Sequence, residues 1–150
     1  MSKGSACCFF GHHDAPDKIK DALRRQVKNL ILNENIRRFY VGNHGHFDYM
    51  ALEVLREMKT EFPDIDYAVV LAYLPENSEK WQDNFTPRET LFPDGLESVP
   101  KRYRIPRRNK WMLDNSDIIL CFVRHYFGGS GKTTDKALKQ GKRIINLAES

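Results

Sequence analysis

Short apolar runs that end at a glycine or a turn alternate, along most of this chain, with segments of helical periodicity. The first apolar run ends at Gly11 and the second at Gly42. Continuous apolar runs of this length are typical of strands buried on both faces, whereas apolar residues that recur with the period of a helix indicate amphipathic helices. We expect strands at residues 6–10, 39–41, 67–74, 118–123 and 143–147, and helices at residues 17–33, 47–58, 108–113 and 133–140.

This strand–helix alternation predicts parallel strands joined by right-handed crossovers. The predicted fold class is therefore α/β, a Rossmann-like three-layer sandwich with a mostly parallel five-stranded sheet. A length of 150 residues fits a single domain, residues 1–150, that is large enough to bury its own core.

Residues 75–107 interrupt the alternation and contain five of the seven prolines. An irregular stretch of this length inside a compact domain is usually functional or disordered. Its aromatic residues favour an ordered excursion beside a site; they are Trp81, Phe85, Phe92 and Tyr103.

The composition is that of an ordinary soluble protein with a net charge of +4. Since no apolar run approaches the ~20 residues of a membrane span, and the N-terminal run is too short for a signal peptide, we expect a cytoplasmic protein with no membrane partner. The three cysteines lack metal-ligand spacing and are interpreted as small buried residues of a reducing compartment. No metal and no cofactor are expected.

Basic residues concentrate between Lys101 and Lys110, where six of ten residues are Lys or Arg. One interpretation is a nucleic-acid surface that includes Tyr103 and Trp111. The other is a solvated helix face together with the rim of a pocket for one anionic ligand. We favour the second, because no basic stripe elsewhere extends the footprint, and nucleic acid stays an alternative partner.

A glycine-rich turn, Gly128 to Gly131, stands between the fourth predicted strand and the helix that follows it. Backbone N–H groups at such a turn, together with the helix dipole, favour an anion. The following Lys132-Thr133 invites comparison with a P-loop, but Tyr126 stands where a P-loop needs glycine. Since Arg108 precedes the same strand and supplies a bidentate donor, the predicted ligand is a phosphorylated, nucleotide-like small molecule.

The remaining site residues follow from the position of the loops, because ligands of open α/β sheets bind beyond the carboxyl ends of the strands. Those loops are Gly11–Asp14, Gly42–Gly45, Leu74–Pro75 and Arg124–Gly131, and all five histidines lie on or beside them. Asp48 either caps its helix or contacts a ribose hydroxyl. The candidate ligand-binding residues are Gly11, His12, Gly42, Asn43, Gly45, Asp48, Arg108, Asn109, Gly128, Gly129, Ser130, Gly131, Lys132 and Thr133. The GxGxxG fingerprint is absent from the loop after the first strand, which argues against an NAD-dependent dehydrogenase.

Five stretches together resemble the YpsA-like SLOG proteins, over about residues 6–148: CCFFGHH, FYVGNHGHFD, VVLAYLP, LFPDGLESVPKRYRIPRRNKWMLDNSDIILCFV and GGSGKTTDKALKQGKRIINL. That family usually has Gly-His-Arg-Pro after the first strand, and here His13 and Asp14 occupy the Arg and Pro positions. The resemblance implies a domain of small bacterial and phage proteins that binds a nucleotide or ADP-ribose-type ligand, as a sensor or scavenger. It also implies a homo-oligomer.

The wider superfamily includes the Lonely Guy phosphoribohydrolases, whose arginine helix is followed by a strand and a Pro-Gly-Gly-x-Gly-Thr-x-x-Glu motif. Arg108 matches their arginine, three of the turn glycines match theirs, and Asp135 occupies the position of their catalytic glutamate. This implies an alternative function, N-glycosidic hydrolysis of a nucleoside monophosphate with Asp135 facing the ligand as the catalytic residue. The superfamily also includes the DprA DNA-processing proteins, whose Arg-Asn-Arg run is partly matched at residues 108–110 and implies a DNA-binding module as a second alternative.

Overall fold

A six-stranded, all-parallel sheet forms the centre of the molecule, in the order β4-β3-β2-β1-β5-β6. The computed structural model describes residues 5–74, 85–125 and 129–149. The strands are β1 (Ala6–Gly11), β2 (Arg38–Val41), β3 (Asp66–Val70), β4 (Thr90–Leu91), β5 (Ile118–Phe122) and β6 (Arg143–Asn146). The helices are α1 (Lys20–Glu34), α2 (His46–Glu61), α3 (Lys101–Asp114) and α4 (Gly129–Lys139), with short 3₁₀ turns at Asp17–Ile19, Pro87–Glu89, Leu96–Ser98 and Leu147–Glu149.

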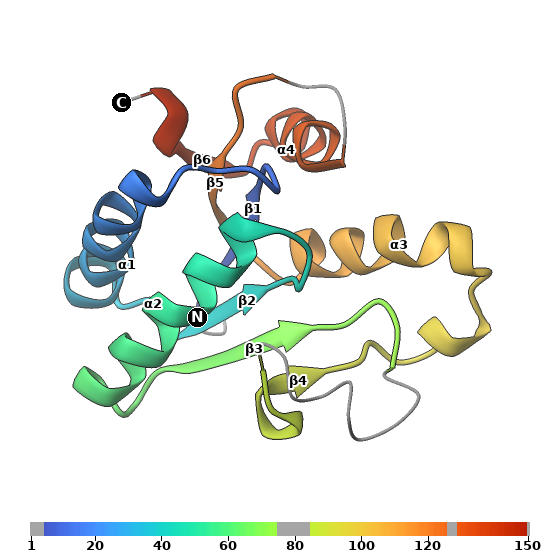
Figure 1. The fold of residues 1–150 in the computed structure, drawn as a ribbon, viewed down its shortest axis with the longest axis horizontal. Helices are drawn as coiled ribbons and strands as arrows, with labels where there is room; N and C mark the ends of the chain where they lie inside the picture. Colours follow the sequence, from blue (N-terminus) through green and yellow to red (C-terminus); the bar gives the residue numbers. More distant parts are fainter. Residues whose placement is uncertain (1–4, 75–84, 126–128, 150) are drawn as a thin grey trace.

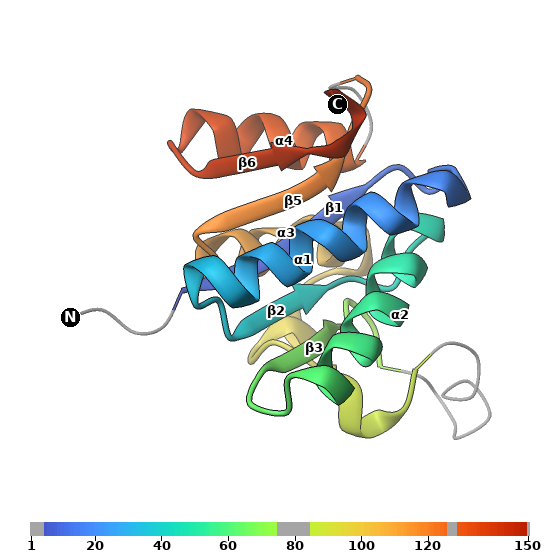
Figure 2. The same ribbon diagram turned by 90° about the vertical axis from the view of Figure 1, so that its left-hand side faces the viewer.

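Helices cover both faces of the sheet, α1 and α2 on one and α3 and α4 on the other (Figures 1 and 2). Along β1 the side chains alternate between the two layers, as the pleat of a strand requires. Cys7 and Phe9 join the core under α1 and α2, whereas Cys8 and Phe10 join the core under α3 and α4. The predicted α/β, Rossmann-like three-layer sandwich is therefore confirmed.

The predicted strand count was wrong by one, because residues 75–107 contain β4. This edge strand has only two residues, Thr90 and Leu91, which pair with Val69 and Val70 of β3. A strand this short has no visible periodicity. β3 ends at Val70 and not at residue 74 because its pairing ends there on both sides: Val69 pairs with Val41, the last residue of β2, and Val70 pairs with Leu91, the last residue of β4.

Helix α3 begins at Lys101, seven residues before the predicted start at 108. Its buried residues are Arg108, Met112 and Leu113, all in the second half, so the first turns have no apolar stripe. Pro106 lies inside the helix and normally indicates a helix break. For these two reasons the first half of α3 could not be predicted from the sequence.

The sheet has a topological switch point between β1 and β5. The chain runs outward from β1 through β2 and β3 to β4, and then returns to place β5 on the other side of β1. Gly11 and Phe122 pair at the carboxyl ends of β1 and β5. Loops leave this point in opposite directions, which opens a crevice there. Within the described ranges, no helix is both long enough and apolar enough to cross a bilayer.

Candidate functional site

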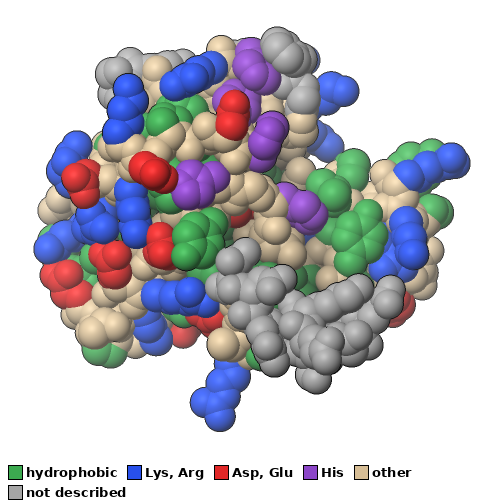
Figure 3. Space-filling view, in the orientation of Figure 1, with side chains coloured by type: hydrophobic (Ala, Val, Ile, Leu, Met, Phe, Trp, Pro, Cys, Tyr) green, Lys and Arg blue, Asp and Glu red, His purple; other side chains and the backbone are tan. Residues whose placement is uncertain are grey.

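A cavity of about 400 Å³ lies at this switch point, in the size range of small-molecule sites. We call it the switch-point cavity. Its wall combines the loop after β1, the start of α2, the middle of α3 and the start of α4, and histidines gather on this face of the molecule (Figure 3). The lining residues are Phe9, Phe10, Gly11, His12, His13, Asp14, Gly42, His44, Asp48, Ile105, Arg108, Asn109, Met112, His125, Gly129 and Ser130.

Arg108 stands in the wall of this cavity and is only 3% exposed. Its Nη1 donates to the carbonyl of Val70 at 2.8 Å and to Oδ1 of Asn43 at 3.3 Å. Its Nε donates to Oδ1 of Asn109 at 2.8 Å, and its Nη2 lies 3.2 Å from Nδ1 of His44. Four of its five N–H groups therefore serve to join β3, the loop after β2 and α3.

Asp48 lies beside Arg108 and is 9% exposed. One carboxylate oxygen accepts the N–H of His44 at 2.9 Å and so holds the loop before α2, whereas the N-cap of α2 is Gly45, which has no side-chain cap hydrogen bond. The carboxyl group also lines the cavity, so a contact to a ligand hydroxyl stays open. Burial raises the pKa of Asp48 to about 7, although the His44 N–H and the nearby Arg108 charge oppose that shift.

His12 links the loop after β1 to the loop after β5. Its Nε2 accepts the backbone N–H of Arg124 at 2.9 Å, and its ring stacks on His125 with centroids 4.2 Å apart. Burial, and then the proximity of His125, lower the pKa of His12. A second link runs nearby, where Oγ of Ser130 donates to the carbonyl of Gly11 at 2.7 Å.

The predicted glycine turn is, in its described part, the first turn of α4. Gly129 and Ser130 line the cavity, and a Cβ on Gly129 would meet nothing within 4 Å. Gly131 is buried, Lys132 is exposed, and Oγ1 of Thr133 donates back to the carbonyl of Gly129 at 2.9 Å. Gly128 and Tyr126 lie outside the described residues.

Asn43 and Gly45 lie on the other side of Asp48, where they line a smaller cavity of about 40 Å³. Gly45 has a φ of 99°, and a Cβ there would lie 2.5 Å from Cα of His13. The N–H of His46 donates to the carbonyl of His13 at 2.9 Å. These contacts hold together the loops after β1 and β2.

The structure does not bring Asp135 to the cavity. Its carboxylate lies 3.1 Å from Nζ of Lys139, one turn along the exposed side of α4. Thr134 is fully buried instead, and its hydroxyl has no partner among the described residues. Asp135 is not among the residues that line the cavity, because the buried side of α4 passes through Thr134 and Ala137.

Sequence analysis missed several lining residues. Three histidines of the strand-end loops line the cavity but are not among the candidate ligand-binding residues: His13, His44 and His125. Ile105 was not predicted because residues 75–107 were assigned to an irregular stretch. Met112 was not predicted because an apolar residue at a helical position usually indicates the hydrophobic core and not a ligand contact. No group of three or more potential metal ligands is present within the described part of the chain.

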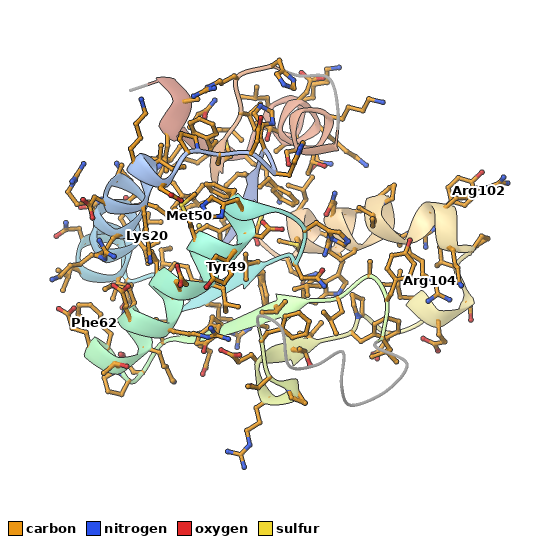
Figure 4. The ribbon with its side chains drawn as sticks, in the orientation of Figure 1. Lys20, Tyr49, Met50, Phe62, Arg102 and Arg104 are labelled. Atoms are coloured by element: carbon orange, nitrogen blue, oxygen red, sulfur yellow. The ribbon has the colours of Figure 1, made fainter. Side chains whose placement is uncertain are left out.

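The basic cluster of α3 extends toward the end of the helix that projects away from the sheet, where Arg102 and Arg104 lie (Figure 4). Arg104 donates to the carbonyls of Val99 and Glu97, both at 2.8 Å. Lys110 pairs with Asp114 at 2.6 Å. Part of the positive charge is therefore already engaged within the molecule.

Comparison with known proteins places the chain in one family. It matches the family model YpsA, described as the YspA SLOG family, over residues 4–146. UPF0398 proteins of Bacillus thuringiensis (strain Al Hakam) and Bacillus cereus (strain Q1) are each 28% identical over 146 residues, which cover 92% of this chain and 78% of the relative.

A solved structure of similar fold is DNA processing protein A (DprA) from Streptococcus pneumoniae. It superimposes with a TM-score of 0.64 at 14% sequence identity, over 95% of this chain. This chain covers 50% of the length of that DprA chain. At this identity the likeness shows a shared fold.

Proposed function

Because this chain belongs to the YspA SLOG family, we propose that it binds a nucleotide or an ADP-ribose-type phosphorylated small molecule in the switch-point cavity. One observation carries the proposal. The first turn of α4 and the buried guanidinium of Arg108 line the same cavity, at the position where open α/β sheets bind their ligands.

The start of α4 provides the anion-binding element of this proposal. The first N–H groups of an α-helix have no acceptor within the helix, and the helix dipole makes that end partly positive. Gly129 has no side chain, and the space where its Cβ would stand is open. A phosphoryl group can therefore approach these N–H groups closely.

Arg108 has a mainly positioning role in this site, since most of its donors are already engaged with Val70, Asn43, His44 and Asn109. It contributes positive charge to a wall from which water is largely excluded, where charge interactions are stronger than in water. The apolar side chains of Phe10, Ile105 and Met112 offer a surface for the base.

Hydrolysis of an N-glycosidic bond is a second candidate function. Since Asp48 lines the cavity and Asp135 does not, Asp48 is the candidate catalytic carboxyl group. That reaction needs a carboxyl group beside the sugar. Asp48 is the buried carboxyl group of the cavity, and its pKa of about 7 suits a proton donor at neutral pH. Release of free base from AMP that survives in Asp48→Asn would exclude this carboxyl group as the catalytic one.

The binding proposal is tested by filling the open space at Gly129. We expect Gly129→Leu to fold normally but to lose at least about tenfold in affinity for AMP, ADP or ADP-ribose, the equivalent of about 1.4 kcal/mol. Gln140→Leu adds the same side chain to an exposed position after α4 and is the matched control. Equal calorimetric affinities of the two variants would place the ligand elsewhere.

A further inference from the structure

The ionisable groups that line the switch-point cavity supply less fixed positive charge than a phosphate monoester carries in negative charge. Among the described lining residues, Arg108 is the one permanent cation, and Asp14 and the ionised fraction of Asp48 oppose it. A phosphate monoester brings about −1.5 to −2 charges at pH 7. The remaining ionisable groups are four imidazoles, which are positive only when protonated: His12, His13, His44 and His125.

We propose that the switch-point cavity takes up a proton together with a phosphate monoester, and that the stacked pair His12–His125 holds this proton on the ring of His125. The inference rests on the proposed function and specifies the ligand as a phosphate monoester that binds together with a proton.

The hydrogen bond of His12 excludes it as the acceptor. Its Nε2 accepts the N–H of Arg124, so the ring hydrogen of neutral His12 lies on Nδ1. Protonation of Nε2 would place two hydrogens between the same pair of nitrogens and break this link between the two loops. Burial and neighbouring groups also lower the pKa of His12, which agrees with a neutral ring.

His44 and His13 are weaker candidates for the proton. Nδ1 of His44 lies 3.2 Å from Nη2 of Arg108, and burial and this cation lower the pKa of His44. His13 is exposed to water, where its charge is screened from the ligand. His125 lines the same cavity as Gly129 and stacks on a ring that stays neutral, so a proton on His125 adds a positive charge to the cavity wall to which the start of α4 belongs.

The charged groups around the pair have opposing effects. Asp14 lies near His12 and attracts a proton, whereas Arg124 and His13 repel one. The guanidinium of Arg124 is exposed and lies over the ring of Phe122 at 4.9 Å. Arrival of a dianion changes this balance, because it adds negative charge on the same side as His125.

The experiment uses AMP as the probe and counts protons. Calorimetric titrations at pH 7 in PIPES and in imidazole, whose protonation heats differ, should show net uptake of up to about one proton per AMP bound. Affinity should fall with rising pH, by as much as about tenfold per pH unit where the proton is fully linked. His125→Gln should abolish both effects, whereas His46→Gln should change neither, since His46 lies outside the cavity and pairs with Asp17.

Each possible result of these titrations either supports or overturns proton uptake at His125. Equal binding heats in both buffers would overturn it while leaving the binding proposal intact. Uptake that persists in His125→Gln and disappears in Asp48→Asn would transfer the proton to the buried carboxyl group and overturn the assignment to the pair. Failure of AMP and every other phosphate monoester to bind would overturn the proposed function and this inference together.

A second measurement covers the case in which His125→Gln does not fold. Ring-nitrogen chemical shifts of His12 in the unliganded wild-type protein should report hydrogen on Nδ1. Hydrogen on Nε2 would contradict the bond to Arg124 and remove the argument that excludes His12.

Discussion

Two glycines at the ends of β1 and β2 allow close packing at the site, because a Cβ at either position would press on its neighbours. A Cβ on Gly11 would lie 2.2 Å from Cγ of Phe47, the first apolar residue of α2. A Cβ on Gly42 would lie 3.0 Å from Oδ2 of Asp48 and 3.1 Å from Nη1 of Arg108. The absence of a side chain therefore lets helix α2 and the buried charges approach the strand ends.

Replacement of Gly11 tests this close approach. We expect Gly11→Ala to destabilise the fold by about 1–3 kcal/mol, as overpacking does, because the ring of Phe47 and its backbone must move. Gly129→Ala is the matched control, since its Cβ meets nothing and alanine favours a helix. Urea unfolding of both variants measures the difference, and equal stability would show that Phe47 yields without cost.

The buried carboxyl group of Asp48 should make stability depend on pH. Its pKa is about 7 in the folded protein, against an ordinary value of 3.8 for an aspartate, so the folded state binds the proton more tightly. Its contribution to stability is thus lost as pH rises from about 4 to about 7, and the full loss remains above that range.

The corresponding experiment compares wild type with Asp48→Asn at pH 5 and pH 8. Wild type should lose about 2–3 kcal/mol of unfolding free energy relative to the variant between these values. Urea unfolding at both values gives the comparison. Parallel curves for the two proteins would mean that Asp48 is ionised throughout.

The places of Gly11, Gly42 and Asp48 near the strand ends could be predicted from the sequence, whereas the direction of the Asp135 side chain could not. Gly11 ends β1, Gly42 directly follows β2 and Asp48 lies in the first turn of α2, so all three belong to the carboxyl edge of the sheet, which the order of strands and helices already indicates. The direction of Asp135 depends on the rotational phase of α4, and one helical residue turns a side chain by about 100°. Packing of α4 against the sheet decides that phase: it buries Thr134 and Ala137 and leaves Asp135 beside Lys139.

At the scale of elements, α1 and α2 are joined by three ion pairs with a constant offset of 33 residues. Lys20 pairs with Glu53 at 2.7 Å, Arg24 with Glu57 at 2.8 Å, and Lys28 with Glu61 at 3.0 Å. Lys20 is visible on α1 close to α2 (Figure 4). Each series repeats every four residues, so each lies along one side of its helix.

Charge exchange tests this ladder. We expect the triple replacement of Lys20, Arg24 and Lys28 by Glu to lower the free energy of unfolding by about 1–3 kcal/mol. Each exposed ion pair contributes little by itself, but in the variant all three attractions become repulsions. Replacing the three glutamates of α2 by Lys in the same protein should restore most of the loss. Thermal unfolding at low and high salt measures both, and a loss that the second triple does not restore would refute the pairing.

The edge strand β4 is held by side chains that no local pattern reveals. The carboxylate of Glu89, just before β4, accepts hydrogen bonds from Nε of Arg56 at 2.7 Å and from the hydroxyl of Tyr67 at 2.6 Å. The Arg56 hydrogen bond, the largest cause, lowers the pKa of Glu89 to about 2. Partners so distant in sequence explain why the helices and long strands were predictable and β4 was not.

At the scale of the whole molecule, the switch-point cavity is the place where two halves of the sheet meet. The loop after β1 and the start of α2 belong to the half that ends at β4, and α4 belongs to the half that ends at β6. The described links between the halves at this edge are few, among them Ser130 to Gly11 and His12 to Arg124. A ligand bound in the cavity therefore adds contacts between the halves.

Hydrogen exchange should report this bridging in one experiment. At 100 times its dissociation constant, AMP adds about 2.7 kcal/mol of stability, and local openings that release the ligand are suppressed accordingly. We expect slower exchange at residues 129–131 of α4 and at residues 42–45 before α2 together. The internal control is the end of α1, residues 30–34, which lies remote from the cavity lining. Protection confined to one of the two segments would show that the ligand contacts a single half of the sheet, and the phosphoryl group would then have to be assigned to that half alone.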